Sequence, residues 1–237
     1  MVNPRAWLAE AIATFGLVFF GPLSVILAVV AFGEGLSIEA IIMISLGHGA
    51  IIALMVYAFG HVSGAHINPA VTIPMIITKK IGVADGAGYI AFQVIGGIIA
   101  TLSLMALFPE IGKGVLWGGH GGPGELLNFS MASAFVVEII LTFFLVVVIF
   151  MTAVHKKAPK SVYGAAIGGM VFLLHLVGIP LTGASMNPAR SFAPAIATGD
   201  SGLLEVQWLY WAAPIIGGII AGVIMTYVYV NKAEKEA

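Results

Sequence analysis

The chain has 237 residues, of which 60% are hydrophobic and only 9% are charged, and its formal net charge is −1. Soluble domains carry about 25% charged residues, so this composition is typical of a protein that crosses a membrane several times. The nearly neutral charge and the lack of a basic arm argue against a nucleic-acid partner. The sequence contains no cysteine, which excludes disulfides and thiolate metal sites.

Six apolar stretches are long enough to cross a bilayer, because a spanning helix needs about 20 mostly apolar residues. They lie at residues 6–31, 37–60, 86–107, 130–154, 161–180 and 208–230. Two further apolar segments, 68–78 and 187–198, begin at Asn-Pro and are too short to span. Asparagine can cap a helix, and proline at the first helical position loses no hydrogen bond. We therefore expect an all-α membrane protein with six transmembrane helices and two re-entrant half-helices.

The two halves of the chain carry matching motifs. SGAHINPAVT at residues 63–72 matches TGASMNPARS at residues 182–191, and IGGIIA occurs at both 95–100 and 216–221. Glu10 and Glu138 each begin a Glu-x-x-x-Thr-Phe motif. Matching motifs in the same order indicate an internal duplication. Each half has three spans, so the second copy must enter the membrane from the opposite side. We expect one channel domain over 1–237, with inverted repeats at approximately 1–115 and 128–237.

Lysine and arginine residues mark the cytoplasmic side of a membrane protein. In this topology one side holds Arg5, Lys79, Lys80, Lys156, Lys157, Lys160, Lys232 and Lys235. Lys113 alone lies in a connection on the other side, and Arg190 lies within a re-entrant segment. We therefore expect cytoplasmic termini, in an integral membrane protein of the plasma membrane.

The two Asn-Pro-Ala triplets point to the centre of a pore. Opposed half-helices bring their N-termini together, and each N-terminus carries unpaired N–H groups and roughly half a positive charge. Such a centre repels cations, protons included. Asn68 and Asn187 would add amide donors, so that a water bonded to both passes no proton along the file. Each asparagine could instead be a simple helix cap, but caps do not require matched interruptions.

The segments before the triplets are expected to be non-helical at membrane depth. Their carbonyl groups then need partners, which pore water can supply. We expect a ladder of backbone acceptors along one wall of the pore, formed by Gly64, Ala65, His66, Ile67, Gly183, Ser185 and Met186. Arg190 lies about one helical turn after Asn187, where it can offer donors to water and repel cations. An intramembrane charge is a functional site by default, and the alternative is an arginine whose side chain reaches the interface.

These features together resemble the aquaporins, the major intrinsic protein family. The resemblance covers nearly the whole chain and includes both triplets, with Pro69, Ala70, Pro188 and Ala189 as well as the asparagines. It implies a homotetramer in the lipid bilayer, with one pore in each protomer. It also implies that Glu10 and Glu138 brace the re-entrant segments by accepting backbone hydrogen bonds. Because no carboxylate cluster or cofactor motif is present, we expect no metal and no cofactor.

The family also has a narrow outer filter, which the resemblance places at His48, His175, Ala184 and Arg190. His175 with Arg190 is similar to the water-selective members, and Ser191 stands where glycerol facilitators usually have aspartate. His48 departs from this pattern, because strict water channels usually have phenylalanine there. Histidine is more similar to a plant vacuolar-membrane subfamily, some of whose members also pass ammonia or urea. We expect a filter slightly wider and wetter than a strict water filter.

The leading interpretation is a passive water channel that excludes protons and ions. A channel for ammonia, hydrogen peroxide, glycerol or urea remains open because of His48. A secondary transporter would need buried carboxylates for ion coupling, and the bracing role accounts for Glu10 and Glu138. The sequence offers no nucleophile–base pair that would indicate an enzyme. His120 lies in the glycine-rich segment 117–124, which we expect to be an ordinary exposed outer loop; the alternative is a loop that folds over the pore mouth.

Overall fold

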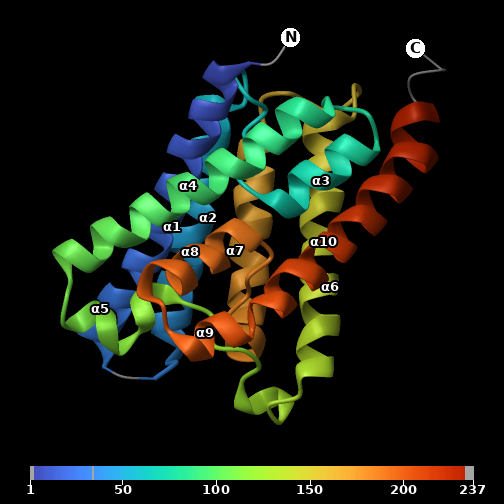
Figure 1. The fold of residues 1–237 in the computed structure, drawn as a ribbon. Helices are drawn as coiled ribbons and strands as arrows, with labels where there is room; N and C mark the ends of the chain where they lie inside the picture. Colours follow the sequence, from blue (N-terminus) through green and yellow to red (C-terminus); the bar gives the residue numbers. More distant parts are fainter. Residues whose placement is uncertain (1–2, 34, 233–237) are drawn as a thin grey trace.

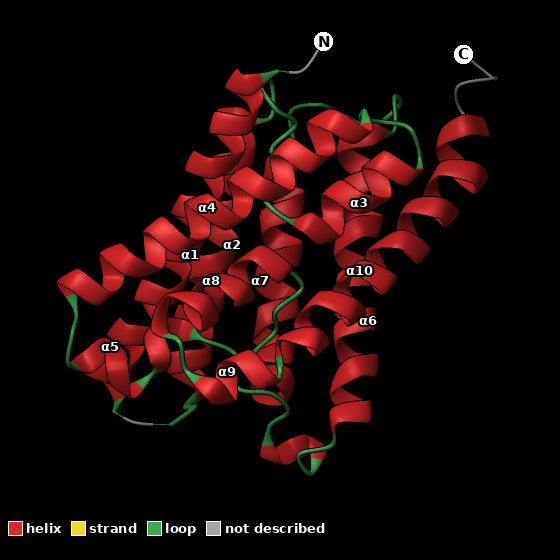
Figure 2. Cartoon of the chain, viewed as in Figure 1, coloured by secondary structure: helices red, strands yellow, loops and turns green. Residues whose placement is uncertain are grey.

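The computed structural model describes residues 3–33 and 35–232, and every regular element in these ranges is a helix (Figures 1 and 2). Lys235 of the sequence-based orientation argument lies outside these ranges. Six helical stretches are long and apolar enough to cross a membrane. They are α1 (Pro4–Phe32), α2 (Ile38–Phe59), α4 (Val83–Leu107), α6 with its π-helical end η3 (Met131–Ile149, Phe150–Val154), α7 (Tyr163–Thr182), and α9, α10 and η4 (Ser201–Glu205, Gln207–Ile224, Met225–Val230). The predicted all-α fold with six spans is confirmed.

Two short helices, α3 (Pro69–Ile77) and α8 (Pro188–Thr198), lie among the long ones (Figure 1). Each begins with proline directly after an asparagine N-cap, as the Asn-Pro pairs predicted. With nine and eleven residues, they extend about 14 and 17 Å at 1.5 Å per residue. That is about half of a 30 Å hydrocarbon core, so neither can span it.

Close helix contacts at two glycines fix the half-helices in place. A methyl group added at Gly218 of α10 would lie 2.2 Å from the carbonyl oxygen of Ala70 in α3. One added at Gly97 of α4 would lie 2.9 Å from Cβ of Ala193 in α8 and 3.3 Å from the carbonyl oxygen of Ala189. Both glycines belong to the repeated IGGIIA motif. The motif therefore serves the tight packing of a long helix against a half-helix.

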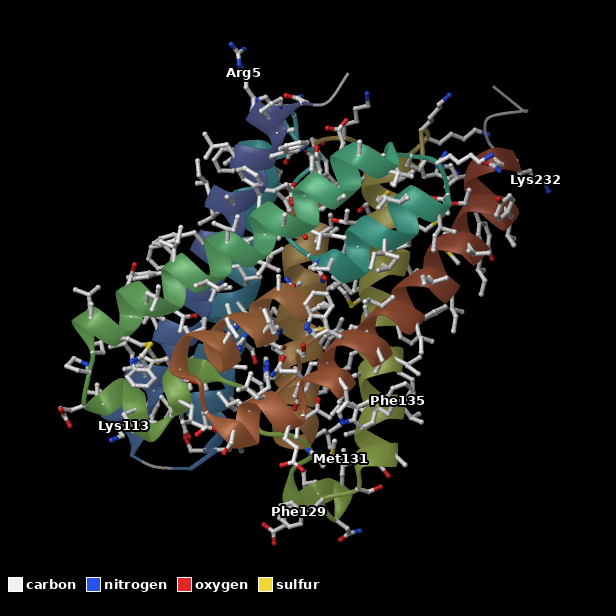
Figure 3. The ribbon with its side chains drawn as sticks, in the orientation of Figure 1. Arg5, Lys113, Phe129, Met131, Phe135 and Lys232 are labelled. Atoms are coloured by element: carbon white, nitrogen blue, oxygen red, sulfur yellow. The ribbon has the colours of Figure 1, made fainter. Side chains whose placement is uncertain are left out.

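The two ends of the molecule differ in charge and in connection length. The start of α1 and the end of η4 lie at the same end of the bundle, where Arg5 and Lys232 project, and Lys113 projects at the opposite end (Figures 1 and 3). The end with Lys113 also carries the short helices α5 (Ile111–Gly114), η1 (Leu116–Gly118) and η2 (Glu125–Leu127). These elements belong to one long connection between α4 and α6, residues 108–130, which we call the outer connection.

The outer surface of the spans is apolar. Large side chains that are about half exposed include Leu8, Phe20, Leu54, Ile99, Phe144 and Val177. An apolar surface spread over so many helices is unfavourable in water, but a bilayer covers it.

Candidate pore and selectivity filter

Glu10, about two turns into α1, holds the segment that leads into α3. Its Oε1 accepts hydrogen bonds from the Ser63 hydroxyl at 2.7 Å and the His66 N–H at 2.8 Å. Its Oε2 accepts from the Ile67 N–H at 2.6 Å and from the Gln93 amide at 2.7 Å. These four bonds satisfy a fully buried carboxylate and fix a non-helical backbone at membrane depth.

Glu138 in α6 holds the segment that leads into α8 in the same way. Its Oε1 accepts from the Thr182 hydroxyl at 2.6 Å and from the Ser185 N–H at 2.9 Å. Its Oε2 accepts from the Met186 N–H at 2.9 Å. Since both carboxylates are occupied by backbone and side-chain donors, neither is free to couple an ion to transport.

The held backbone is unusual in both segments. Positive φ angles occur at matched positions, namely Gly64, Ala65 and Ile67 in the first segment and Gly183, Ala184 and Met186 in the second. Non-glycine residues rarely adopt this region, and they keep it only where surrounding contacts fix them. The bonds to the two glutamates supply those contacts.

Asn68 and Asn187 cap their own half-helices. Oδ1 of Asn68 accepts from the Ala70 N–H at 2.7 Å, and Oδ1 of Asn187 accepts from the Ala189 N–H at 3.1 Å. The cap role weighed from the sequence is therefore present at both positions. It uses only the oxygen of each side-chain amide, so the nitrogen can act elsewhere.

The two amide nitrogens join the segments across the centre of the molecule. Nδ2 of Asn68 donates to the carbonyl oxygen of Met186 at 2.7 Å, and Nδ2 of Asn187 donates to that of Ile67 at 2.9 Å. An amide group carries two N–H donors, so this arrangement uses one in each asparagine. The second N–H of each remains for a molecule in the cavity that both residues line.

A cavity of about 360 Å³ passes this asparagine pair. At one end it is lined by Lys80, Ile81 and Tyr163, and its walls include apolar side chains such as Leu17, Val71 and Leu145. It is also lined by His66 and by Gly64, Ala65, Ile67, Ser185 and Met186 of the two segments. Toward the outer connection it reaches His48, His175 and Arg190. A mostly apolar conduit with a few polar groups suits small neutral molecules.

Arg190 is buried, with 3% of its surface exposed, and is held by groups from three elements. Its Nη1 donates to the carbonyl oxygen of Gly118 and, at 3.4 Å, to Nδ1 of His120. Its Nη2 donates to Nε2 of His48 at 3.1 Å. Its Nε finds no hydrogen-bond partner among the residues that the structure describes. These bonds use three of the five N–H donors of the guanidinium, which leaves the Nε N–H and one N–H of Nη2.

His48 and His175 stack with their ring centroids 4.3 Å apart. Nδ1 of each ring lies 2.9 Å from the carbonyl oxygen four residues earlier, so each Nδ1 must carry the proton. In the neutral rings Nε2 is therefore an acceptor. The acceptor of His48 is used by Arg190, whereas that of His175 is buried without a partner in the described part of the chain.

Ala184, the fourth predicted filter residue, is completely buried. A methyl group added at Gly178 in α7 would lie 2.8 Å from Cβ of Ala184, so the alanine packs on that helix. It follows Gly183, whose carbonyl oxygen accepts from Nε2 of His120 at 3.1 Å. The small side chain lets its segment lie close to α7.

A family model described as "Major intrinsic protein" matches residues 1–225. The chain belongs to the major intrinsic protein family, the aquaporins. It is 37% identical to aquaporin Z of Rhodopseudomonas palustris over 230 residues, which cover 94% of this chain and 92% of that protein. It is 43% identical to human aquaporin-4 over 194 residues, 81% of this chain and 58% of that longer protein. The X-ray structure of the aquaglyceroporin from Plasmodium falciparum has the same fold, with a TM-score of 0.82, 22% identity and coverage of 98% and 99%.

Membership in the aquaporin family confirms the resemblance drawn from the motifs. Aquaporins are channels rather than enzymes, and this chain is an integral membrane protein of that kind. Because the chain belongs to this family, the cavity and its polar residues are a candidate path for water or small solutes.

One residue of this aquaporin lies elsewhere than the sequence indicated. We expected His120 in an exposed loop, but it is buried, with 4% of its surface exposed. Nδ1 of His120 accepts from the Ser191 hydroxyl at 2.8 Å as well as from Arg190. The prediction is wrong because the outer connection folds inward against α8, and glycines around His120 gave no signal of that contact. Burial, and then the charge of Arg190, lower the pKa of His120 well below its ordinary value.

Two tyrosines contribute hydrogen bonds to this site that the sequence analysis did not assign to them. The Tyr89 hydroxyl donates to the carbonyl oxygen of Ser63, and the Tyr210 hydroxyl donates to that of Thr182, both at 2.7 Å. They bind the first residue of each matched segment. A signal was present, since the two tyrosines stand at the same distance before the repeated IGGIIA motif.

Proposed function

We propose that this aquaporin is a passive water channel. The observation that carries the proposal is the cavity that passes Asn68 and Asn187, each of which keeps one N–H for a molecule there. A molecule at this centre must accept hydrogen bonds from both amides, and water does so. Backbone carbonyl groups hold both side chains in place before a solute arrives, so little reorganisation is needed.

Ammonia is the second candidate, because it accepts one hydrogen bond and donates others. The feature that favours it is His48 in place of a larger apolar ring. Its imidazole is polar and accepts a hydrogen bond from Arg190. The resulting filter favours small neutral molecules that form hydrogen bonds, and glycerol is a weaker candidate because it must pass three closely held side chains.

Exclusion of protons and cations is assigned to two barriers. The first is the centre, where the positive ends of α3 and α8 meet and Asn68 and Asn187 keep one N–H each. A water that gives its oxygen to both cannot also accept a proton from the next water. The second is the fixed positive charge of Arg190.

The assembly and orientation follow from the family and from the charges. We propose a homotetramer with one pore in each protomer, built from inverted repeats at approximately 1–115 and 128–237. Arg5 and Lys232 lie at one end and Lys113 at the other (Figure 3), which supports cytoplasmic termini. We place the channel in the plasma membrane.

The test is stopped-flow light scattering on proteoliposomes that contain the purified protein. We expect rapid shrinkage in an impermeant osmolyte, a rate linear in the osmotic gradient and independent of ion gradients, and slow glycerol entry. Saturable uptake driven by an ion gradient would support a transporter instead, and a rate equal to that of empty liposomes would refute the channel.

The role of His48 is tested by His48→Phe. Loss of the polar ring should lower the flux of ammonia or methylamine more than that of water. An unchanged ratio of the two fluxes would refute the assignment of solute choice to this position.

A further inference from the structure

Contacts hold the His48 ring at both of its nitrogens, on one face and against α1. Its Nδ1 is bonded to the carbonyl oxygen of Ile44 at 2.9 Å, and its Nε2 is bonded to Arg190 at 3.1 Å. One face stacks on His175, with an angle of 27° between the rings. The ring also lies against α1, at Gly21.

Gly21 gives the ring the space that it occupies. A methyl group added there would lie 2.6 Å from Nε2, 2.7 Å from Cδ2 and 3.0 Å from Cε1 of His48. These distances are far shorter than ordinary contacts, which begin near 3.4 Å. The imidazole therefore rests directly on the backbone of α1.

A positive φ does not explain this glycine. Gly21 lies inside the 29-residue helix α1 and is not one of the described glycines with positive φ. It precedes Pro22, whose ring crowds a preceding Cβ in a helix, so part of the reason is local. Glycine within a helix is less favourable than alanine by about 1 kcal/mol, so a packing reason is expected as well, and the His48 ring supplies it.

The next residue supports the other group that holds the guanidinium. A methyl group added at Gly118 would lie 2.8 Å from Cβ of Pro22, so the outer connection rests on Pro22. The carbonyl oxygen of Gly118 accepts from Nη1 of Arg190. Two consecutive residues of α1 therefore support both the His48 and the Gly118 acceptors of Arg190.

We propose that Gly21 is a positioning residue that determines the selectivity of the filter. Gly21 itself does not line the described cavity, whereas His48 does, so the ring lies between them. The missing side chain lets the ring sit back against α1, which sets the width of the filter and the place of Arg190. A side chain at this position would move the ring toward His175 and the cavity. The inference depends on the proposed role of His48 in the filter.

The experiment is a double-mutant cycle on the full chain in proteoliposomes, with Gly21→Ala, His48→Ala and the double variant. We expect Gly21→Ala to lower water flux about fivefold, because the displaced ring narrows the filter and raises the barrier to water. The ratio of methylamine to water flux should change as well. In the His48→Ala background the same substitution should have almost no effect. Gly16→Ala is the matched control, since a methyl group there meets the flexible Met55 side chain at 3.3 Å and Cδ1 of Ile51 at an ordinary 3.6 Å.

An equal loss of flux in both backgrounds would overturn the proposal, because Gly21 would then act through helix packing alone. An unchanged flux and ratio in Gly21→Ala would overturn it as well. If Gly21→Ala does not fold, the double variant decides: recovery of folding and flux supports the proposal, and failure refutes it. The proposed water function is tested separately by the wild type, and if that passes another solute, the cycle is measured with that solute.

Discussion

The two half-helices and their lead-in segments share one construction but differ at their second turn. In both, a buried glutamate accepts backbone N–H groups, a tyrosine hydroxyl binds the first residue, and an asparagine caps the helix. Three residues after the asparagine, however, α3 has Val71 in the apolar core and α8 has Arg190. The shared parts hold the backbone, whereas the position that differs lines the cavity with an apolar side chain in one half and a charged one in the other.

The next position differs in its partners too. The Thr72 hydroxyl lies 3.1 Å from Nδ1 of His66, within its own segment, and from the Gln93 amide. The Ser191 hydroxyl likewise bonds its own segment, at Ser185, and in addition bonds His120 of the outer connection. Both half-helices are thus satisfied by neighbouring elements, but only the second also recruits a distant loop. The comparison teaches that the matched parts form a scaffold, and it supports the proposal that selectivity arises where the two halves depart from each other.

The largest effect is expected from breaking a shared part. Glu10→Gln replaces an acceptor oxygen by an amino group that faces N–H donors. Because hydrogen bonds to a charged group contribute about 1.5–3 kcal/mol each, we expect a loss of about 3 kcal/mol in the free energy of unfolding. Glu138→Gln should cost somewhat less, since Glu138 accepts three hydrogen bonds from the described residues and Glu10 accepts four. Thermal unfolding in detergent measures both.

The exposed Glu39 supplies the control for this pair, as Glu39→Gln makes the same chemical change outside the core. Losses no larger than that of the control would mean that the two carboxylates do not brace the scaffold.

The next effect is expected from making the two half-helices alike. Arg190→Val places at α8 the residue that α3 has, and it removes the charge and its donors from the filter. Loss of about 1.4 kcal/mol of barrier raises a flux tenfold, so we expect about tenfold faster glycerol or methylamine entry and a measurable proton leak. Light scattering and a pH-sensitive dye inside the liposomes measure these. Arg5→Val, at the exposed start of α1, should leave both unchanged, and an unaltered solute profile in Arg190→Val would contradict the comparison.

The scaffold could be predicted from the sequence, because its residues occur twice. Apolar length predicted the six spans and the two half-helices. The repeated motifs predicted that Glu10 and Glu138 are counterparts in the two halves. The filter could be placed only in part. The contact of His120 with Arg190 joins residues 70 positions apart and occurs in one half alone, so no repeat announced it. Likewise, the close approach of Gly21 to His48 depends on the crossing of α1 and α2, which no local pattern encodes.

The smallest effect concerns pH and separates the exposed loop expected from the sequence from the buried one observed. An exposed histidine titrates near pH 6.5. Burial and the charge of Arg190 lower the pKa of His120 well below this value. Arg190, His175 and Tyr210 are the titratable neighbours of its ring. His120 should therefore stay neutral and keep accepting from Ser191, so water flux should not change between pH 8 and pH 6.

Stability should respond where flux does not. Because the pKa of His120 is lower in the folded state, the unfolded chain binds more protons below about pH 6.5, and stability then falls as pH falls. The melting temperature should thus decline below pH 6.5, less steeply in His120→Asn. A flux midpoint near pH 6.5 that disappears in His120→Asn would contradict the buried loop. A flat flux profile with an acid-sensitive melting temperature would instead indicate that His120 is part of the scaffold, where its neutral ring holds the filter in place.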